Sequence, residues 1–263
     1  MYIGKFLMPR FAANLSTLYT EHDFPGRFAA AREDGFAGVE FQFPYAWEGK
    51  ELARRAREAG VEVVLFNLPP GDWDAGERGI ACHPGREAEF REGVGRAIDY
   101  AQALGCERVN CLAGIPPQGA DEAAARRTLA GNLRYAAGEL ERAGIRLMLE
   151  PINTRDMPGF FVSRTPQALD LIAEANCGNL FVQYDIYHAQ AMEGDLARTI
   201  EENLASIGHV QIADNPGRHE PGTGEINFPF LFALLDRMGY AGWVGCEYRP
   251  SAGAGAGLGW LVR

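Results

Sequence analysis

The feature that most constrains the fold is a strict alternation of short apolar segments with longer segments of helical periodicity. The apolar segments lie at 10–15, 38–41, 61–67, 108–112, 145–149, 180–184, 207–212 and 243–246. Short continuous apolar runs are typical of strands that are buried on both faces of a parallel sheet. The helical segments between them provide the crossover connections that parallel pairing requires.

Helices are expected at 24–34, 48–59, 86–104, 121–143, 165–175, 195–204 and 227–238. Several of them end directly before a glycine, a residue that commonly terminates helices, as at Gly60 and Gly105. Thr165 and Pro166 predict a helix start, with Thr165 as the N-cap residue and the proline in the first helical position.

Eight strands alternating with helices predict an α/β protein with a closed (β/α)8 TIM barrel; a doubly wound open sheet is the alternative. The 263 residues suit one such barrel, and no linker or change in composition marks a second domain. We therefore expect a single domain over residues 1–263, with a Gly/Ala-rich tail from about residue 251. The irregular segment 68–84 is long for a compact domain, and loops of this length usually cover a site.

Charge and cysteine content exclude several classes of protein. The net charge of -10 argues against nonspecific binding to nucleic acid or to an anionic membrane, but it permits an anionic substrate beside a local arginine or a metal. The five cysteines include no CxxC pair, which favours a reducing compartment over a disulfide framework or structural zinc. No segment is long enough for a signal-peptide core or a membrane span, so we expect a soluble cytoplasmic protein.

Four consecutive strands end in side chains that carry oxygen atoms. In a TIM barrel the chemistry lies at the carboxyl ends of the strands, and here these ends place Glu150, Asp185, Gln211 and Glu247. Carboxylates at close range repel one another unless a cation lies between them. An all-oxygen set suits Mg²⁺ or Mn²⁺ better than zinc or copper, so the pattern predicts a divalent metal site.

Each of these residues also has a structural interpretation. Asp185 could cap a helix, Gln211 could satisfy a backbone group, and Glu247 could pair with Arg249. The coincidence of four strand ends favours a site over four separate structural roles.

Several motifs together resemble the hydroxypyruvate isomerase family of xylose isomerase-like TIM barrels. The likeness is carried by Leu149-Glu150-Pro151-Ile152-Asn153, Gln183-Tyr184-Asp185-Ile186-Tyr187-His188, Gln211-Ile212-Ala213-Asp214-Asn215-Pro216, the run 220–227 and Gly245-Cys246-Glu247-Tyr248. It extends over nearly the whole chain, apart from the first few residues and the Gly/Ala tail. Related ketose epimerases have a histidine where this chain has Gln211, which makes an epimerase of ordinary sugars the weaker alternative.

The resemblance implies that Glu150, Asp185, Gln211 and Glu247 hold the metal, and that Glu150 and Glu247 form the acid/base pair. Interconversion of an α-hydroxy ketone and an α-hydroxy aldehyde moves a proton between neighbouring carbons through an enediolate, which a divalent ion stabilises. One carboxylate on each side can serve as base and as conjugate acid. The expected reaction is therefore isomerisation of hydroxypyruvate to 2-hydroxy-3-oxopropanoate (tartronate semialdehyde).

The carboxylate of such a substrate needs a cation. Arg218 and Arg249 are the main candidates, with Arg78 and Arg86 as weaker ones, and an ordinary surface charge is the alternative for each. His188 is expected to bind a substrate oxygen or to orient Asp185, against a purely structural role. His83, His209 and His219 lack a partner in the sequence and receive no role.

Other functions compatible with the motifs are isomerisation of a 2-oxo-tetronate, 3-epimerisation of a ketose and, more distantly, metal-dependent endonuclease activity, because this barrel superfamily includes DNA-repair enzymes. The acidic net charge and the lack of a basic stripe disfavour the nuclease. The expected partner is a small 2-oxo or hydroxy acid, with no nucleic acid and no membrane, and a homo-oligomer is left open.

Overall fold

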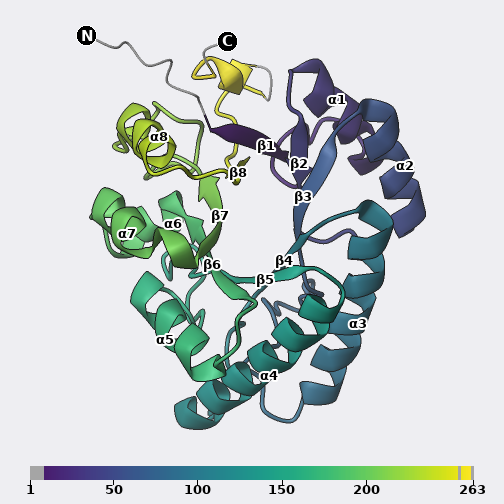
Figure 1. The fold of residues 1–263 in the computed structure, drawn as a ribbon, viewed down its shortest axis with the longest axis vertical. Helices are drawn as coiled ribbons and strands as arrows, with labels where there is room; N and C mark the ends of the chain where they lie inside the picture. The colour runs from purple at the N-terminus through teal and green to yellow at the C-terminus, as the bar shows by residue number, and fades with distance from the viewer. Residues whose placement is uncertain (1–8, 254–255, 262–263) are drawn as a thin grey trace.

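The computed structural model describes residues 9–253 and 256–261. Eight parallel strands form a closed barrel in sequence order, with helices around it (Figure 1). The strands are β1 (Arg10–Asn14), β2 (Gly38–Glu40), β3 (Glu62–Asn67), β4 (Arg108–Cys111), β5 (Arg146–Leu149), β6 (Leu180–Asp185), β7 (Ile207–Ile212) and β8 (Trp243–Cys246). Pairing of β1 with β8 closes the sheet, with Phe11 opposite Val244. This confirms the predicted (β/α)8 barrel and excludes the open sheet.

The helices lie where the periodicity predicts them, with one addition. They are α1 (Arg27–Glu33), α2 (Gly49–Ala59), α3 (Glu87–Leu104), α4 (Glu122–Arg142), α5 (Thr165–Ala175), α6 (Ile186–Met192), α7 (Leu196–Asn203) and α8 (Phe228–Arg237), with 3₁₀ turns at Phe24–Gly26, Leu204–Ser206 and Ala256–Leu258. The short helix α6 was not expected, because it begins directly after β6 without an intervening loop.

Helix ends follow the predicted glycines. Gly60 and Gly105 cap α2 and α3 with φ angles of 70° and 66°, a left-handed conformation that costs glycine little. The N-cap prediction for α5 is wrong by one residue: Arg164 is the cap, and Thr165 is already helical. Thr165 instead donates from its hydroxyl and its backbone N–H to Glu193 Oε1, at 3.0 and 2.7 Å, so a distant carboxylate replaces the local cap.

The tail is better packed than its Gly/Ala composition suggests. Trp260 lies edge-on against Phe11, with ring centroids 5.0 Å apart, and its indole N–H donates to the Tyr248 hydroxyl at 3.3 Å. These contacts of a large, half-buried ring help to hold the described part of the tail against the barrel. Residues 254–255 and 262–263 of the predicted tail, and the apolar stretch 1–8, lie outside the described residues.

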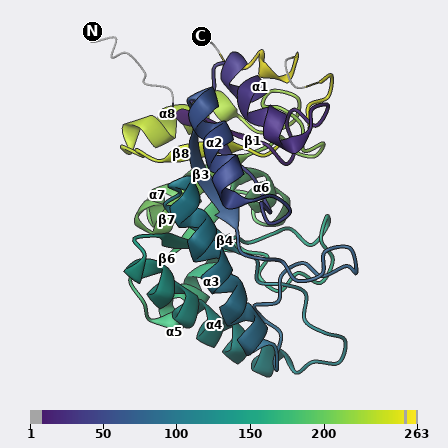
Figure 2. The same ribbon diagram turned by 90° about the vertical axis from the view of Figure 1, so that its right-hand side faces the viewer.

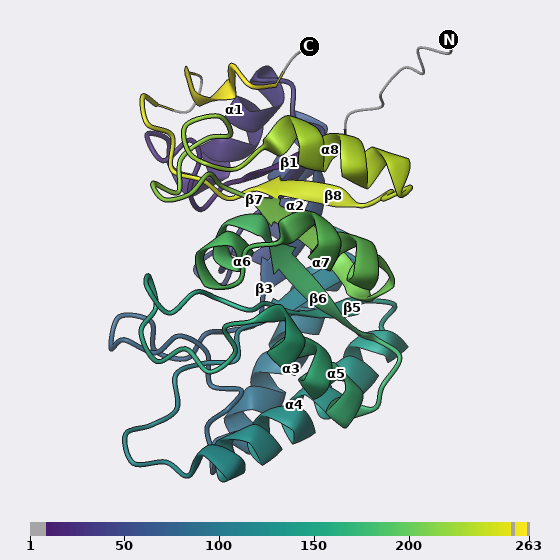
Figure 3. The same ribbon diagram turned by 90° about the vertical axis from the view of Figure 1, so that its left-hand side faces the viewer.

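The long loops after β3, β4 and β5 project beyond the barrel on the same side as α6 (Figures 2 and 3). This side holds the carboxyl ends of the strands, where the fold predicts the site. Among the residues that the structure describes, no helix combines the length and the apolar character needed to cross a bilayer.

Candidate active site

The carboxyl ends of the strands surround a pocket with an apolar wall and a polar floor. The wall includes Phe43 and Trp73, whose ring centroids are 5.0 Å apart, and the floor includes Glu150, Gln211 and Glu247. Trp73 belongs to the irregular segment 68–84, so this loop does cover the site, as its length predicts. An apolar wall lowers the local dielectric and strengthens the electrostatic interactions of the floor.

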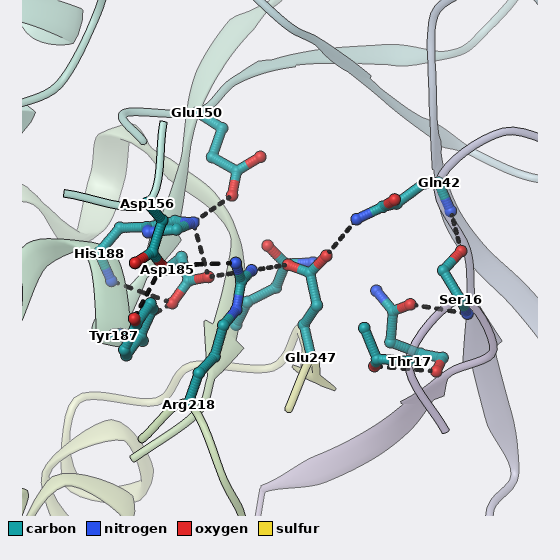
Figure 4. Close-up of polar contacts among 12 residues, drawn as sticks. Ser16, Thr17, Gln42, Glu150, Asp156, Asp185, Tyr187, His188, Arg218 and Glu247 are labelled. Atoms are coloured by element: carbon teal, nitrogen blue, oxygen red, sulfur yellow. Dashed lines mark hydrogen bonds and ion pairs between the residues drawn. The ribbon is translucent and has the colours of Figure 1, made fainter. Parts of the chain in front are cut away.

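Three buried carboxylates approach one another in the pocket (Figure 4). Glu150 follows β5, Asp185 ends β6, and Glu247 follows β8, so each is held at a strand end. Glu150 Oε2 accepts a hydrogen bond from Asn110 Nδ2 at 3.0 Å, and Glu247 Oε1 accepts one from Gln42 Nε2 at 2.8 Å. Each carboxylate therefore keeps an oxygen that these two amides do not occupy.

The two oxygens of the Asp185 carboxylate have different environments. Its Oδ1 accepts the backbone N–H of Tyr187 at 2.8 Å and caps α6, as its structural interpretation foresaw. Its Oδ2 is buried and has no hydrogen-bond partner. A buried anionic oxygen without a donor is costly, so this atom is available for a cation or a ligand.

Arg218 is the cation of this group. Its Nη2 lies 3.3 Å from Glu247 Oε2 and 4.0 Å from Asp185 Oδ2, and its Nη1 lies 3.9 Å from Asp156 Oδ2 (Figure 4). Its backbone has a φ of 54°, which is uncommon for a residue with a side chain and is often seen at functional sites.

The loop that carries Arg218 is built around Asp214. The Asp214 carboxylate accepts the backbone N–H groups of Asn215, Gly222 and Ile226 at 2.9, 2.8 and 3.1 Å. The backbone N–H of Arg218 donates to the Asp214 carbonyl at 2.8 Å. These bonds fix the loop, which directs the guanidinium into the pocket.

Gln211 belongs to a buried polar network inside the barrel. Its Nε2 donates to Glu40 Oε1 at 2.7 Å, and its Oε1 accepts from Gln183 Nε2 at 2.6 Å. Glu40 also pairs with His209 Nε2 at 2.7 Å and accepts from Asn14 Nδ2 at 2.9 Å. The partners of Gln211 are thus side chains rather than the backbone group considered from the sequence, and they define the orientation of its amide.

Burial shifts the pKa values of the site strongly. It raises the pKa of Glu150 well above its ordinary value, with Glu247 as the next cause. Burial likewise raises the pKa of Asp185 to about 7, although Arg218 opposes the shift, and it raises the pKa of Glu247. Burial and then Arg218 lower the pKa of the His188 imidazole well below its ordinary value. The three carboxylates are therefore short of positive charge, because within residues 9–253 and 256–261 Arg218 is the one guanidinium that faces them.

This shortage fits a divalent cation. Atoms of Glu150, Asp185 and His188 lie within 4.8 Å of one another and form a possible metal site. The free Asp185 Oδ2 is the oxygen that a hard cation would take. The predicted set of Glu150, Asp185, Gln211 and Glu247 lines or borders the same pocket and stays a prediction.

The structure brings His188 and Arg218 to the pocket but not Arg249. The Arg249 side chain is exposed, and its backbone N–H donates to the Arg218 carbonyl at 2.8 Å. Glu247 consequently pairs with Arg218 rather than with Arg249. The prediction that Arg249 binds substrate gains no support from this geometry, because the chain leaves the barrel after Glu247 and the Arg249 side chain faces solvent.

The two weaker arginine candidates do not line the pocket and have other partners. The Arg78 guanidinium stacks over Trp73, 4.1 Å from the ring centroid, and Arg86 pairs with Glu77 and Glu89. Sequence reasoning missed Gln42 and Asp156, which lie in loops after β2 and β5. A search for polar residues just beyond each strand end would have found Gln42.

We predict that Asp185 makes the metal-free protein less stable as pH rises from about 4 to about 7. The pKa of Asp185 rises from 3.8 to about 7, so in this window the folded protein holds a proton that the unfolded chain has released. Unfolding then releases a proton, and the free energy of unfolding falls with rising pH. Urea unfolding of chelator-treated protein at several pH values measures this slope. The Asp185→Asn variant should show a shallower fall; an identical slope in both proteins contradicts the assignment.

Comparison with known proteins places the chain in a family. Residues 28–263 match the family model described as xylose isomerase-like TIM barrel. The chain is 52% identical to the 2-oxo-tetronate isomerase of Cupriavidus necator and 54% identical to the hydroxypyruvate isomerase of Escherichia coli. Each comparison covers 97% of this chain and 98% of the relative.

Solved structures agree with this result. A crystal structure described as AP endonuclease, family 2, from Brucella melitensis matches with a TM-score of 0.94 and 50% identity, over 97% of this chain and 98% of that one. An L-ribulose 3-epimerase matches with a TM-score of 0.76 at 24% identity, over 94% and 83% of the two chains, which shows a common fold. The resemblance found in the motifs is thereby confirmed. The chain belongs to the xylose isomerase-like TIM barrel family, in which it is an isomerase of the group that contains the hydroxypyruvate and 2-oxo-tetronate isomerases.

Proposed function

We propose that this isomerase converts hydroxypyruvate and 2-hydroxy-3-oxopropanoate into each other, with Glu150 and Glu247 as the acid/base pair. The observation that carries the proposal is the placement of these two buried carboxylates at one pocket, both with a raised pKa. A carboxylate with a raised pKa is a better base near neutral pH, and its conjugate acid is a useful proton donor.

The reaction moves hydrogens without changing the composition of the substrate. One carboxylate removes a proton from the hydroxymethyl carbon, and the second carboxyl group returns a proton to the former carbonyl carbon. The hydroxyl proton moves from one oxygen to the other, so that the ketone becomes an alcohol and the alcohol becomes an aldehyde. Glu150 and Glu247 follow β5 and β8, which are three strands apart in the barrel, and so approach the pocket from different directions.

A divalent cation, Mg²⁺ or Mn²⁺, belongs to this proposal. Glu150, Asp185, Gln211 and Glu247 would hold it, and the buried Asp185 Oδ2, which accepts no hydrogen bond, supports that assignment. When bound, such an ion stabilises negative charge on two neighbouring substrate oxygens. Arg218, relieved of part of its pairing with the carboxylates, would bind the substrate carboxylate, and His188 would bind a substrate oxygen.

A four-carbon 2-oxo acid is the second candidate substrate. The relatives named for 2-oxo-tetronate and for hydroxypyruvate are almost equally similar to this chain, at 52% and 54% identity. The chemistry at the two reacting carbons is the same for both acids, so only the part of the pocket beyond them distinguishes the substrates. Ketose 3-epimerisation is a more distant alternative, because its relatives show the common fold alone.

The proposed setting is the cytoplasm. All five cysteines are free, and Cys82, Cys106, Cys111 and Cys246 are buried, which supports a reducing compartment. We also propose that residues 1–263 form one domain, that its partner is a small acid rather than nucleic acid or membrane, and that the chain can form a homo-oligomer.

The test is proton exchange in D2O. We expect the Mg²⁺- or Mn²⁺-loaded protein to incorporate deuterium into hydroxypyruvate and to produce an aldehyde, both followed by proton NMR. A parallel reaction with a four-carbon 2-oxo acid compares the two substrates, and cleavage of abasic-site DNA is measured in the same buffer. Deuterium incorporation into hydroxypyruvate without formation of an aldehyde would indicate that the four-carbon acid is the substrate. No exchange with either acid, together with DNA cleavage, would overturn the isomerase proposal in favour of the endonuclease.

A further inference from the structure

We propose that Asn153 is a positioning residue that holds His188 as the neutral tautomer with its hydrogen on Nε2. His188 then donates a hydrogen bond into the pocket and does not ligate the metal. The inference rests on the proposed function in taking this pocket as the active site and in placing a divalent cation at its carboxylates.

The side-chain amide of Asn153 has one possible orientation. Its Oδ1 accepts the backbone N–H groups of Arg155 and Asp156, at 3.0 and 2.8 Å. If the amide were turned over, its NH₂ group would face two N–H donors and both hydrogen bonds would be lost. The Nδ2 group must therefore point the other way, where it lies 2.6 Å from His188 Nδ1 and 3.2 Å from Asp156 Oδ2.

This orientation determines the state of the imidazole. Because Asn153 Nδ2 can only donate, His188 Nδ1 must accept, and it cannot carry a hydrogen. The imidazolium ion is excluded for the same reason, since it would place N–H against N–H at 2.6 Å. Both residues are buried, with exposures of 0% and 2%, so water cannot mediate a different arrangement. The one remaining hydrogen of the ring lies on Nε2.

The Nε2–H group faces the catalytic carboxylates. It lies 3.6 Å from Asp185 Oδ2 and 3.8 Å from Glu150 Oε1, too far for a good hydrogen bond to either (Figure 4). A nitrogen that carries a hydrogen has no lone pair for a metal. The compact group of Glu150, Asp185 and His188 therefore divides into two ligands for a cation and one donor for a substrate oxygen.

Nitrogen-15 NMR of histidine-labelled protein tests this assignment, because protonated and unprotonated ring nitrogens give distinct signals. The chain has five histidines, and two of them are internal references. His83 Nε2 lies 2.8 Å from the Ile115 carbonyl and His219 Nδ1 lies 2.7 Å from the Arg249 carbonyl. A carbonyl can only accept, so these rings carry their hydrogens on Nε2 and Nδ1 respectively. The His188→Gln variant identifies the His188 signals by their loss.

We expect His188 to match the His83 pattern without metal and to keep it after addition of Mg²⁺. Asn153→Asp keeps the acceptor for the two backbone N–H groups but presents an oxygen to Nδ1. In this variant the His188 hydrogen should move to Nδ1, or both nitrogens should be protonated, while the two reference histidines are unchanged. Asn227→Asp, which alters a helix cap on α8, is the matched control and should leave all histidine signals in place.

Two results would overturn the proposal. One is an Nδ1–H pattern for His188 in the unaltered protein, and the other is loss of the Nε2 hydrogen when Mg²⁺ binds. Both are measured on the unaltered chain, so they hold even if Asn153→Asp fails to fold. The tautomer is determined without substrate, so failure of the hydroxypyruvate assay leaves this test unaffected.

Discussion

Glu150→Gln and Glu247→Gln are each expected to lower kcat for the isomerisation by about 10²–10⁴-fold, the usual contribution of a positioned acid or base. Glutamine has nearly the shape of glutamate, and its carbonyl oxygen can still accept from Asn110 at position 150 or from Gln42 at position 247. The amide cannot take up or release a proton near neutral pH. The fold should survive while the proton transfer is lost.

Steady-state kinetics and deuterium exchange measure this effect, and circular dichroism checks the fold. Glu141→Gln, which alters an exposed carboxylate at the end of α4, is the matched control and should retain full activity. If a variant still incorporates deuterium but forms no product, the replaced residue is the one that returns the proton to the former carbonyl carbon. Full activity in either Glu150→Gln or Glu247→Gln would remove that residue from the acid/base pair.

The second large effect is expected from Glu40→Leu, which should lower the free energy of unfolding by about 3–5 kcal/mol. Glu40 is fully buried and receives hydrogen bonds from His209, Gln211 and Asn14. Leucine would leave these polar groups without an acceptor inside the barrel, each with a desolvation cost. Gly245 lies directly behind the carboxylate, where any Cβ would overlap it, so the site is shaped for Glu40.

Urea unfolding measures the loss, with Glu62→Leu on the exposed start of β3 as the control. A double variant, Glu40→Leu with His209→Leu, should recover part of the stability, because both members of the buried pair are then removed. Additive losses in the double variant would show that Glu40 and His209 do not stabilise each other. Equal stability of Glu40→Leu and the unaltered protein would show that the network is not required for folding.

The alternation of segments was sufficient to predict the barrel, because its physical basis is local. A short apolar run bounded by turn residues has few alternatives to a buried strand, and eight of them with crossover helices close into one sheet. The positions of Glu150, Asp185, Gln211 and Glu247 follow from the same reasoning, since the carboxyl ends of parallel strands meet at one end of the barrel. The N-cap prediction for α5 was wrong because the acceptor for Thr165 is Glu193, which lies 28 residues away in the sequence.

Contacts between side chains that are distant in the sequence could not be predicted from the sequence alone. Glu40 and His209 are 169 residues apart and meet only because β2 and β7 both point side chains into the closed barrel. Arg249 follows Glu247 closely in sequence, yet the exit of the chain turns its side chain to solvent, and the guanidinium that pairs with Glu247 belongs to Arg218.

The sequence by itself thus placed Glu150, Asp185, Gln211 and Glu247 at one end of the barrel, because strand ends and their order are encoded locally. Only the tertiary structure decided which neighbours each of these side chains contacts. Whether an oxygen accepts from a neighbour or stays free for a cation depends on separations of a few tenths of an ångström between segments from different strands. The unpartnered Asp185 Oδ2 and the fixed amide of Asn153 are two such outcomes, and no local pattern specifies them.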